Sequence, residues 1–350
     1  FHTLFYSKKS QKETLFWFSL EISLKFLYDE KSIKQNLSGK VTIYFMKQVL
    51  EHPLLSTSHC RLCPRNCEID RNHRVGYCGC FSTVKAARAA LHFWEEPCIS
   101  GTKGSGAVFF SGCTLKCCFC QNHAISSGQI GKDLTPQRLG EIFLSLQEQG
   151  AHNINLITAT HFLPQILPAL ELVKNRLTIP VVYNTSGYEK PEMIDLLKNY
   201  VDIWLPDLKY FDSALSLRYS KAKDYFAFAG PALIKMVQQC PSPVFDSQGI
   251  LQKGVIIRHM VLPGCKEDSI RLLTWLQETL PKHSFLLSLL SQYTPFYKSS
   301  DYPEINRRIT SYEYNKVLDT AIALGLTEGF MQKKSSAKEE YTPPFDLEGV

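Results

Sequence analysis

The chain has 350 residues, of which 44% are hydrophobic and 21% charged, a composition typical of globular proteins. Its net charge of +6 includes no long basic run, so nucleic-acid binding is not indicated. The most apolar early stretch, residues 15–27, is broken by Glu21 and Lys25, and no run is long enough to cross a membrane. The length allows one large α/β domain with an appendage.

The first 45 residues differ in character from the rest of the chain. They begin with Phe1, are rich in Phe, Tyr, Lys and Ser, and precede the first methionine, Met46. We expect residues 1–45 to be a non-native or disordered extension of a protein that starts at Met46, the alternative being a genuine basic arm. A Cys-rich segment at 46–100 and a barrel domain at 101–350 then complete the predicted organisation.

Twelve cysteines are present, and most of them cluster at 60–80 and 113–120. In a chain of this length, short clustered spacings indicate metal or cluster ligation in a reducing compartment rather than disulfides. We therefore expect a cytoplasmic protein.

The first cluster contains Cys60, Cys63, Cys67 and Cys78, with Cys80 as a spare. Cys-x-x-Cys-Pro is a knuckle that directs two thiolates at one point, and the other two cysteines can close the site. Four thiolates suit zinc or a second iron–sulfur cluster equally well. The alternative is a redox dithiol without metal at the first two positions.

The second cluster follows a short apolar run at 107–110 that predicts a buried strand. Cys113, Cys117 and Cys120 have the spacing Cys-x-x-x-Cys-x-x-Cys, and a loop of this length can supply three thiolates to a cubane iron–sulfur cluster. The fourth iron then stays open for chemistry. We expect Cys118 to pack behind the loop. A structural zinc site or a buried thiol cluster is the alternative, although zinc sites usually close with four ligands.

Beyond residue 107, strand and helix patterns alternate. The expected strands lie at 107–110, 154–157, 180–183, 201–205, 254–262 and 285–290. The expected helices lie at 135–149, 163–175, 190–199, in the region up to 239, and at 267–279 and 312–324. Six βα units predict a parallel sheet with helical crossovers, and they are too few for a closed eight-stranded barrel. The predicted fold is thus α/β, a partial (βα)6 TIM-like barrel with a small Cys-rich N-terminal metal-binding segment.

Polar residues follow the expected strands, where site residues of parallel α/β barrels gather. Any one of them alone is equally well explained as a helix cap or a loop hydrogen bond, but together they favour a site. The candidates at the strand ends are Thr158, Thr160, Asn184, Ser186, Asp207, Lys209, Arg258 and His259. Phe119 and Asn122 are candidates on the cysteine loop itself. We expect Glu95 and Glu96 to cap a turn or hold an arginine rather than act in acid–base chemistry.

The Cys113-x-x-x-Cys117-x-Phe119-Cys120 pattern resembles the signature of the radical SAM superfamily. That resemblance implies the radical SAM type of partial barrel and a [4Fe–4S] cluster whose open iron binds the amino and carboxylate groups of S-adenosylmethionine (SAM). It also implies reductive cleavage of SAM to a 5′-deoxyadenosyl radical that abstracts hydrogen.

Longer motifs resemble an uncharacterised family related to pyruvate formate-lyase activating enzyme. They lie at 60–67 (Cys-x-x-Cys-Pro-Arg-x-Cys), 95–101, 109–113, 182–188, 205–210, 258–264 and 345–350. The resemblance places Asp207 and Lys209 near the SAM carboxylate and a bound cation. One departure is that 161–163 read His-Phe-Leu where the activating enzymes have Gly-Gly-Glu, which holds the SAM amino group. Backbone carbonyls, Asn155, Thr158 or Thr160 must then take this role.

The resulting prediction is a radical SAM oxidoreductase, with activation of a glycyl radical enzyme as one role. It implies a reductant such as flavodoxin or ferredoxin and an unknown protein or small-molecule substrate. An alternative is modification of a peptide or small molecule, with an auxiliary cluster at Cys60–Cys78. A rival of another class is a non-catalytic iron–sulfur redox or sensor protein, which predicts neither SAM binding nor SAM cleavage.

Overall fold

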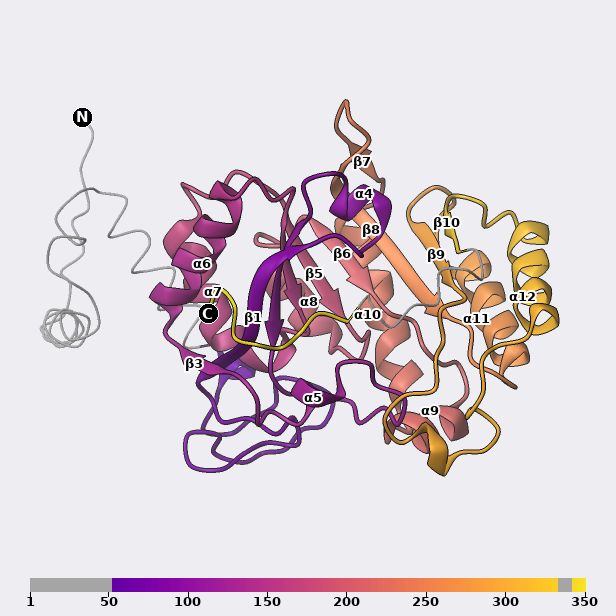
Figure 1. The fold of residues 1–350 in the computed structure, drawn as a ribbon, viewed down its shortest axis with the longest axis horizontal. Helices are drawn as coiled ribbons and strands as arrows, with labels where there is room; N and C mark the ends of the chain where they lie inside the picture. The colour runs from indigo at the N-terminus through magenta and orange to yellow at the C-terminus, as the bar shows by residue number, and fades with distance from the viewer. Residues whose placement is uncertain (1–51, 333–341) are drawn as a thin grey trace, which may run out of the picture. The chain divides into compact units, whose positions relative to one another are not determined.

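A twisted, mostly parallel sheet forms the centre of the computed structural model, which describes residues 52–332 and 342–350 (Figure 1). The expectation for residues 1–45 lies outside the described residues. Six parallel strands occupy the predicted positions, which confirms the α/β prediction. They are β2 (Ser105–Phe110), β4 (Ile154–Ile157), β5 (Val181–Thr185), β6 (Ile203–Pro206), β8 (Leu251–Met260) and β9 (Leu286–Leu290).

The strand order is β10-β9-β8-β6-β5-β4-β2-β1-β3, so in the described part of the chain the sheet remains an open, partial barrel. β10 (Gly329–Met331) extends it in parallel beside β9. β1 (Val84–His92) and β3 (Lys132–Leu134) are antiparallel additions at the other edge, and β7 (Val244–Phe245) pairs with β8. Sequence patterns left β1 unassigned because it is rich in alanine, which is depleted in strands.

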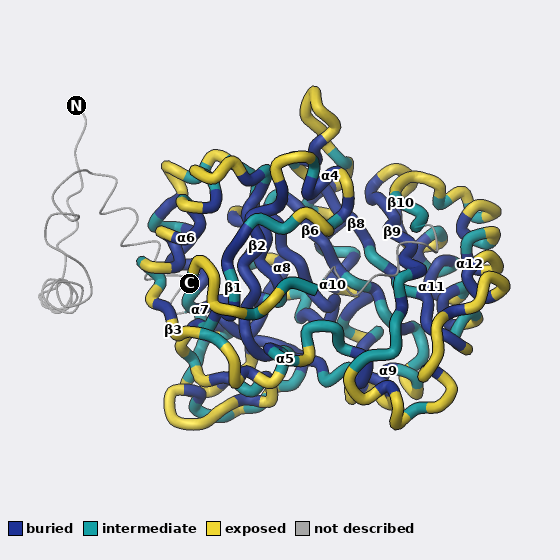
Figure 2. The backbone as a smooth tube through the Cα atoms, in the orientation of Figure 1, coloured by how far each residue is buried: buried dark blue, intermediate teal, exposed yellow. Residues whose placement is uncertain are grey.

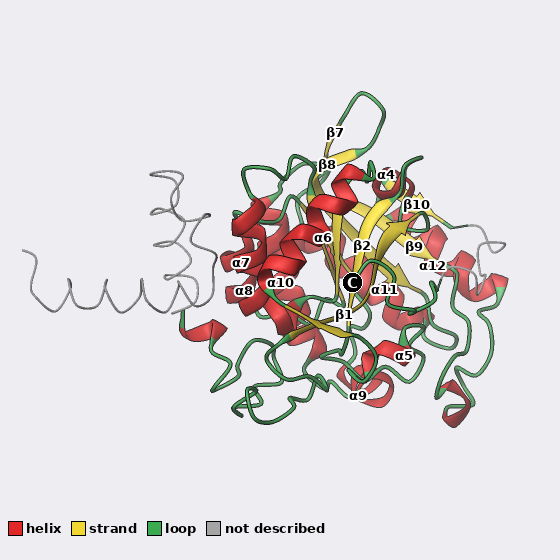
Figure 3. Cartoon of the chain, turned by 60° about the vertical axis from the view of Figure 1, so that its left-hand side comes forward, coloured by secondary structure: helices red, strands yellow, loops and turns green. Residues whose placement is uncertain are grey.

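Helices cross over between the strands and cover the outside of the sheet, as Figure 3 shows for α6, α7, α8 and α10. Their bounds match the expected ranges to within about two residues, apart from the region before 239, which divides into two helices. The helices are α6 (Pro136–Glu148), α7 (Leu163–Val173), α8 (Pro191–Leu197), α9 (Ser213–Ser220), α10 (Tyr225–Gln239), α11 (Lys266–Thr279) and α12 (Ser311–Ala323). Short helical turns lie at α4 (Pro97–Ser100), α5 (His123–Ser126), η1 (Pro53–Leu55), η2 (Thr160–Phe162) and η3 (Ser299–Asp301).

Local chemistry explains where these helices begin. The Thr135 side chain accepts a hydrogen bond from the Arg138 amide, and Pro136 occupies the first position of α6. Thr310 and Glu313 form a reciprocal capping box at the start of α12. Capping satisfies backbone amides that have no partner inside the helix.

The central strands are buried on both faces, which Figure 2 shows as a continuous dark interior. On one face Val182, Ile203 and Leu205 share a cluster with Ile256 of β8. On the other face Tyr183 and Trp204 meet edge to face, with ring centroids 5.6 Å apart. Burial on both faces explains why these strands read as continuous apolar runs. No helix among the described residues is long and apolar enough to span a membrane.

A buried carboxyl group lies just beyond β5. Glu189 is fully buried and accepts hydrogen bonds from the Thr160 hydroxyl, at 2.5 Å, and from the Thr185 hydroxyl. Burial raises the pKa of Glu189 from 4.5 to about 7, and the hydroxyl hydrogen bonds only partly oppose this. Between about pH 4.5 and pH 7, the Glu189 carboxyl group is therefore protonated in the folded protein and ionised in the unfolded chain.

We predict that Glu189 lowers the free energy of unfolding by up to about 3 kcal/mol as pH rises from about 4.5 to 7. The folded state holds more protons than the unfolded state in this window, so stability falls with rising pH. Glu189→Gln removes the titration, and the melting temperature of the variant relative to wild type should rise from pH 5 to pH 8. A constant difference across this range, followed by circular dichroism, would contradict the prediction.

Candidate functional site

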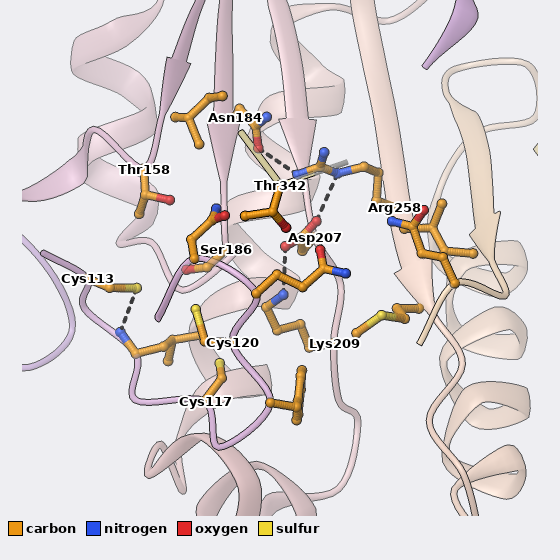
Figure 4. A pocket seen from close by; sticks show the side chains of 18 of the residues that line it. Cys113, Cys117, Cys120, Thr158, Asn184, Ser186, Asp207, Lys209, Arg258 and Thr342 are labelled. Carbon is orange, nitrogen blue, oxygen red and sulfur yellow. Dashed lines mark hydrogen bonds and ion pairs between the residues drawn. The ribbon is translucent and has the colours of Figure 1, made fainter. Parts of the chain in front are cut away.

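A cavity opens at the carboxyl ends of the parallel strands, where the sequence predicts a site (Figure 4). Its walls come from the loop after β2 and from the ends of β4, β5, β6, β8 and β9. Parallel strands bring their carboxyl ends to one edge of a sheet, so residues distant in the chain meet there.

The thiols of Cys113, Cys117 and Cys120 all line this cavity. Burial raises the pKa of Cys113 to about 11 and that of Cys120 to about 12. Burial also raises the pKa of Cys117, while nearby Lys209 and a 2.9 Å hydrogen bond from the Ser220 hydroxyl lower it. Three thiols on one cavity are donors of the kind that hold an iron–sulfur cluster, and the nearby Lys209 ammonium favours the thiolate form of Cys117.

Cys118 is buried and does not line the cavity, in agreement with the expectation that it packs behind the loop. Its amide donates to the carbonyl of Tyr219 at 2.8 Å, and its carbonyl accepts from Lys298 at 2.8 Å. These bonds pin the loop between α9 and the segment after β9.

A network of charged side chains forms the opposite wall. The Arg258 guanidinium contacts Glu95 at 3.0 Å and Asp207 at 2.9 Å, and it donates to the Asn184 side-chain oxygen at 2.5 Å. Lys209 pairs with Asp207 at 2.6 Å. Figure 4 shows Arg258, Asp207 and Lys209 directed toward one another above the cysteine loop.

Burial and neighbouring charges in this network shift the pKa values of its carboxyl groups. Burial tends to raise the pKa of Asp207, but Arg258 and Lys209 hold it below its usual value. Burial raises the pKa of Glu95 despite the attraction of Arg258. A buried cation with two acidic neighbours stays in place because leaving either neighbour unpaired would be costly.

Most predicted binding residues line the cavity, and three do not. Those on the wall are Phe119, Asn122, Thr158, Asn184, Ser186, Asp207, Lys209 and Arg258. The Ser186 hydroxyl is buried without a hydrogen-bond partner among the described residues, so it is available to a ligand.

Asn155, Thr160 and His259 are the three that do not line the cavity. His259 follows Arg258 on β8, and successive side chains point to opposite faces of a strand. Its ring nitrogens contact the Leu208 carbonyl at 2.6 Å and the Ser269 hydroxyl at 2.8 Å. Thr160 donates to Glu189, whereas Asn155 donates to Glu95 at 3.3 Å.

Sequence patterns assigned no binding role to Glu95, Trp94, Thr342 or Pro343, all of which line the cavity. Glu95 holds an arginine, as expected, but that arginine belongs to the cavity wall. Glu95 and the C-terminal residues lie within or next to motifs at 95–101 and 345–350. These motifs could have marked both segments as functional. The segments lie far apart in the chain, however, so the sequence did not show that they meet at one cavity.

The first cysteine cluster, here called the Cys60 group, lies outside this cavity; its members are Cys60, Cys63, Cys67 and Cys78. Cys60, Cys63 and Cys78 are buried, and Cys67 is partly exposed. As the described residues stand, no group of three or more His, Cys, Asp or Glu side chains could hold a metal ion, whether around Cys60 or around Cys113.

Comparison with known proteins places the chain in a family. A model of the radical SAM superfamily matches residues 107–227. The uncharacterized protein MJ0674 of Methanocaldococcus jannaschii is 30% identical over 276 residues, which are 75% of this chain and 74% of that protein. The chain belongs to the radical SAM superfamily. Its cofactors are accordingly a [4Fe–4S] cluster and SAM, and the donor set in the cavity fits them.

Solved structures of SuiB from Streptococcus suis are also similar. The complex with the precursor peptide SuiA is 15% identical with a TM-score of 0.42, covering 62% of this chain and 46% of that one. The complex with SAM is 14% identical with a TM-score of 0.43, covering 63% of this chain and 48% of that one. This chain therefore spans about half the length of the SuiB chains.

We predict that Glu95→Gln weakens SAM binding about tenfold, equivalent to about 1.4 kcal/mol. The substitution removes the carboxylate that holds Arg258 at 3.0 Å against the cavity wall. Equilibrium dialysis of SAM with anaerobically reconstituted protein measures the change.

Glu313→Gln is the matched control. Glu313 is a buried carboxyl group that pairs with Arg307 at 2.7 Å and does not line the cavity. It should change SAM affinity by less than about twofold. Equal losses in both variants would show that the two acids act only through general stability.

Proposed function

We propose that Cys113, Cys117 and Cys120 hold the catalytic [4Fe–4S] cluster and that SAM occupies the cavity above it. The observation that carries this proposal is the convergence of three thiols and a polar wall on one cavity. With both cofactors bound, the cluster would supply one-electron reductive cleavage of a C–S bond of SAM to methionine and a 5′-deoxyadenosyl radical, and this radical would take a hydrogen atom from a substrate C–H bond.

The polar wall supplies contacts for the amino-acid part of SAM. The Lys209 ammonium and the Arg258 guanidinium suit a carboxylate, and Asp207 holds both in place at 2.6 and 2.9 Å. The hydroxyls of Thr158 and Ser186 face the cavity and are available to the amino group or the ribose. These contacts take the place of the Gly-Gly-Glu element that this chain lacks after β4.

The aromatic wall suits the adenine. Phe119 lines the cavity, and its ring meets Tyr293 edge to face with centroids 5.7 Å apart. An aromatic pair fixed in this way offers a rigid flat surface to a base. Apolar side chains complete this wall and keep water away from a reactive radical. They are Leu115, Ile157, Met260, Leu262 and Leu290.

The dimensions of the cavity favour a large substrate presented from outside. Its volume of about 260 Å³ is below the ~300–1,000 Å³ of typical small-molecule sites, so a cavity that holds the cluster and SAM leaves little enclosed room for a substrate. Trp94 lines the cavity yet is 58% exposed, so the wall continues onto the outer surface. A loop of a partner protein fits this arrangement, and we propose a glycine C–H on a glycyl radical enzyme as the hydrogen donor.

Modification of a peptide or small molecule is the second candidate. The separate Cys60 group favours it, because an auxiliary cluster is useful to a modifying enzyme and unnecessary to an activating enzyme. In either case the required electron comes from a small redox protein, for which flavodoxin or ferredoxin is the proposed donor.

The deciding experiment uses the full chain, reconstituted anaerobically, reduced with dithionite and mixed with SAM. We predict that 5′-deoxyadenosine forms with wild-type protein and is absent when Cys113, Cys117 and Cys120 are all changed to Ala. Cys118→Ala is the matched control, because this buried thiol lies on the same loop but does not line the cavity, and the variant should still form the product.

Two outcomes separate the proposal from its rivals. If wild type and Cys118→Ala form 5′-deoxyadenosine and the triple Ala variant forms none, the result supports SAM cleavage at the assigned thiols. If wild-type protein with an intact, reduced cluster forms no 5′-deoxyadenosine, the electron-transfer or sensor role replaces the enzymatic one.

A further inference from the structure

The Cys-rich segment, defined here as residues 57–82, folds back on itself through its own backbone. The Cys60 amide donates to the Ile69 carbonyl at 3.0 Å, and the Glu68 amide donates to the Cys60 carbonyl at 2.9 Å. Asn66 and Glu68 adopt positive φ angles of 42° and 55°, which reverse the chain within the segment. The turn brings Cys60, Cys63 and Cys67 to the same end of the segment.

Cys78 joins these three from farther along the chain. The thiols of Cys60, Cys67 and Cys78 are all electrostatic neighbours of the Cys63 thiol. Cys80 is adjacent to Cys78, because the two thiols share a hydrogen bond, and the Cys80 thiol also reaches the Ser111 carbonyl at 3.3 Å. The structure therefore groups the four cysteines of the predicted site and places the fifth between Cys78 and the start of the cluster loop.

A buried arginine lies against this group. Arg71 is fully buried, and its guanidinium donates to the carbonyls of Cys80 at 3.2 Å, Phe81 at 2.5 Å and His161 at 2.6 Å. One nitrogen lies 4.0 Å from the Cys60 sulfur. In the described ranges, its hydrogen-bond partners are these three carbonyls and this thiol, with no carboxylate among them.

An arginine side chain is charged in any folded protein, and a buried charge needs a compensating partner. Carbonyl oxygens solvate the guanidinium but do not neutralise it. The nearby groups able to become negative are thiols, and thiols are held as thiolates when they bind a metal. Four thiolates around a divalent ion or a cubane carry an excess of negative charge, which Arg71 is placed to balance.

We infer that Cys60, Cys63, Cys67 and Cys78 bind a thiolate-preferring metal centre, a zinc ion or an iron–sulfur cluster, with Arg71 as its buried counter-ion. As they stand, the thiols do not form a group that could hold a metal ion, which is equally true of the Cys113 group. The proposed site therefore requires the turn to close around the metal.

This centre also supports the loop of the catalytic cluster. The Cys113 amide donates to the Cys78 carbonyl at 3.1 Å, and Arg65 donates to the Thr114 carbonyl at 2.8 Å. Gly112 has a φ of 84°, and a Cβ there would lie 2.6 Å from the Cys80 sulfur and 2.7 Å from the Cys78 carbonyl. The Cys-rich segment and the cluster loop are thus in direct backbone contact. Fixing the backbone of one segment therefore restrains the backbone of the other.

The test measures metal content by plasma mass spectrometry and does not depend on SAM cleavage. The full chain with Cys113, Cys117 and Cys120 changed to Ala should retain one zinc ion, or the iron and sulfide of one cluster, per chain. Adding Cys63→Ser should abolish this metal, whereas adding Cys80→Ser should leave it in place. No metal in the parent variant, or equal loss with Cys63→Ser and Cys80→Ser, would overturn the assignment.

Two further measurements avoid the risk that a cysteine variant fails to fold. In wild-type protein, alkylation followed by mass spectrometry should show Cys60, Cys63, Cys67 and Cys78 protected until a chelator removes the metal. Uniform alkylation before and after chelation would count against the site. Arg71→Met should increase the rate of metal loss to a chelator at least about tenfold, and Arg71→Lys should restore part of the difference. Unchanged release in Arg71→Met would remove the counter-ion role.

Discussion

The buried guanidinium of Arg258 is the interaction on which the cavity depends. It lies on β8 and reaches acidic partners contributed by the segment after β1 and by the end of β6. Because a buried cation must keep its partners, Arg258 holds three separate parts of the sheet at fixed separations. Lys209 then extends the same network toward the cysteine loop, since it pairs with Asp207 and interacts electrostatically with Cys117.

The parallel core was predictable because its strands are buried on both faces and therefore appear as uninterrupted apolar runs. The position of Cys113, Cys117 and Cys120 on one cavity followed from spacing and from the strand before them. Arg258 and His259 show the limit of such reasoning. Adjacent polar residues at a strand end appear equivalent in the sequence, yet the pleat sends one into the cavity and the other into the space beneath α11.

Long-range pairing explains the other omissions. Nothing local to Glu95 marks it as a neighbour of Arg258, because the antiparallel β1 that leads to it is rich in alanine and gives a weak strand signal. Arg71 is a similar case in the Cys-rich segment, since its buried partners include the carbonyl of His161, from η2. In both cases the sequence identified the motif but could not identify the partner.

The last residues of the chain have a structural role of their own. Residues 345–348 run along β1, where Arg88 pairs with Asp346 and Glu348, and the Phe345 ring packs on Phe109 with centroids 5.6 Å apart (Figure 1). Just before them, Thr342 and Pro343 complete the wall of the cavity. The same segment thus pairs with the backbone of β1 and closes one side of the cavity. Proteolytic removal of residues 342–350 would therefore spare the parallel strands and open the cavity to solvent on that side.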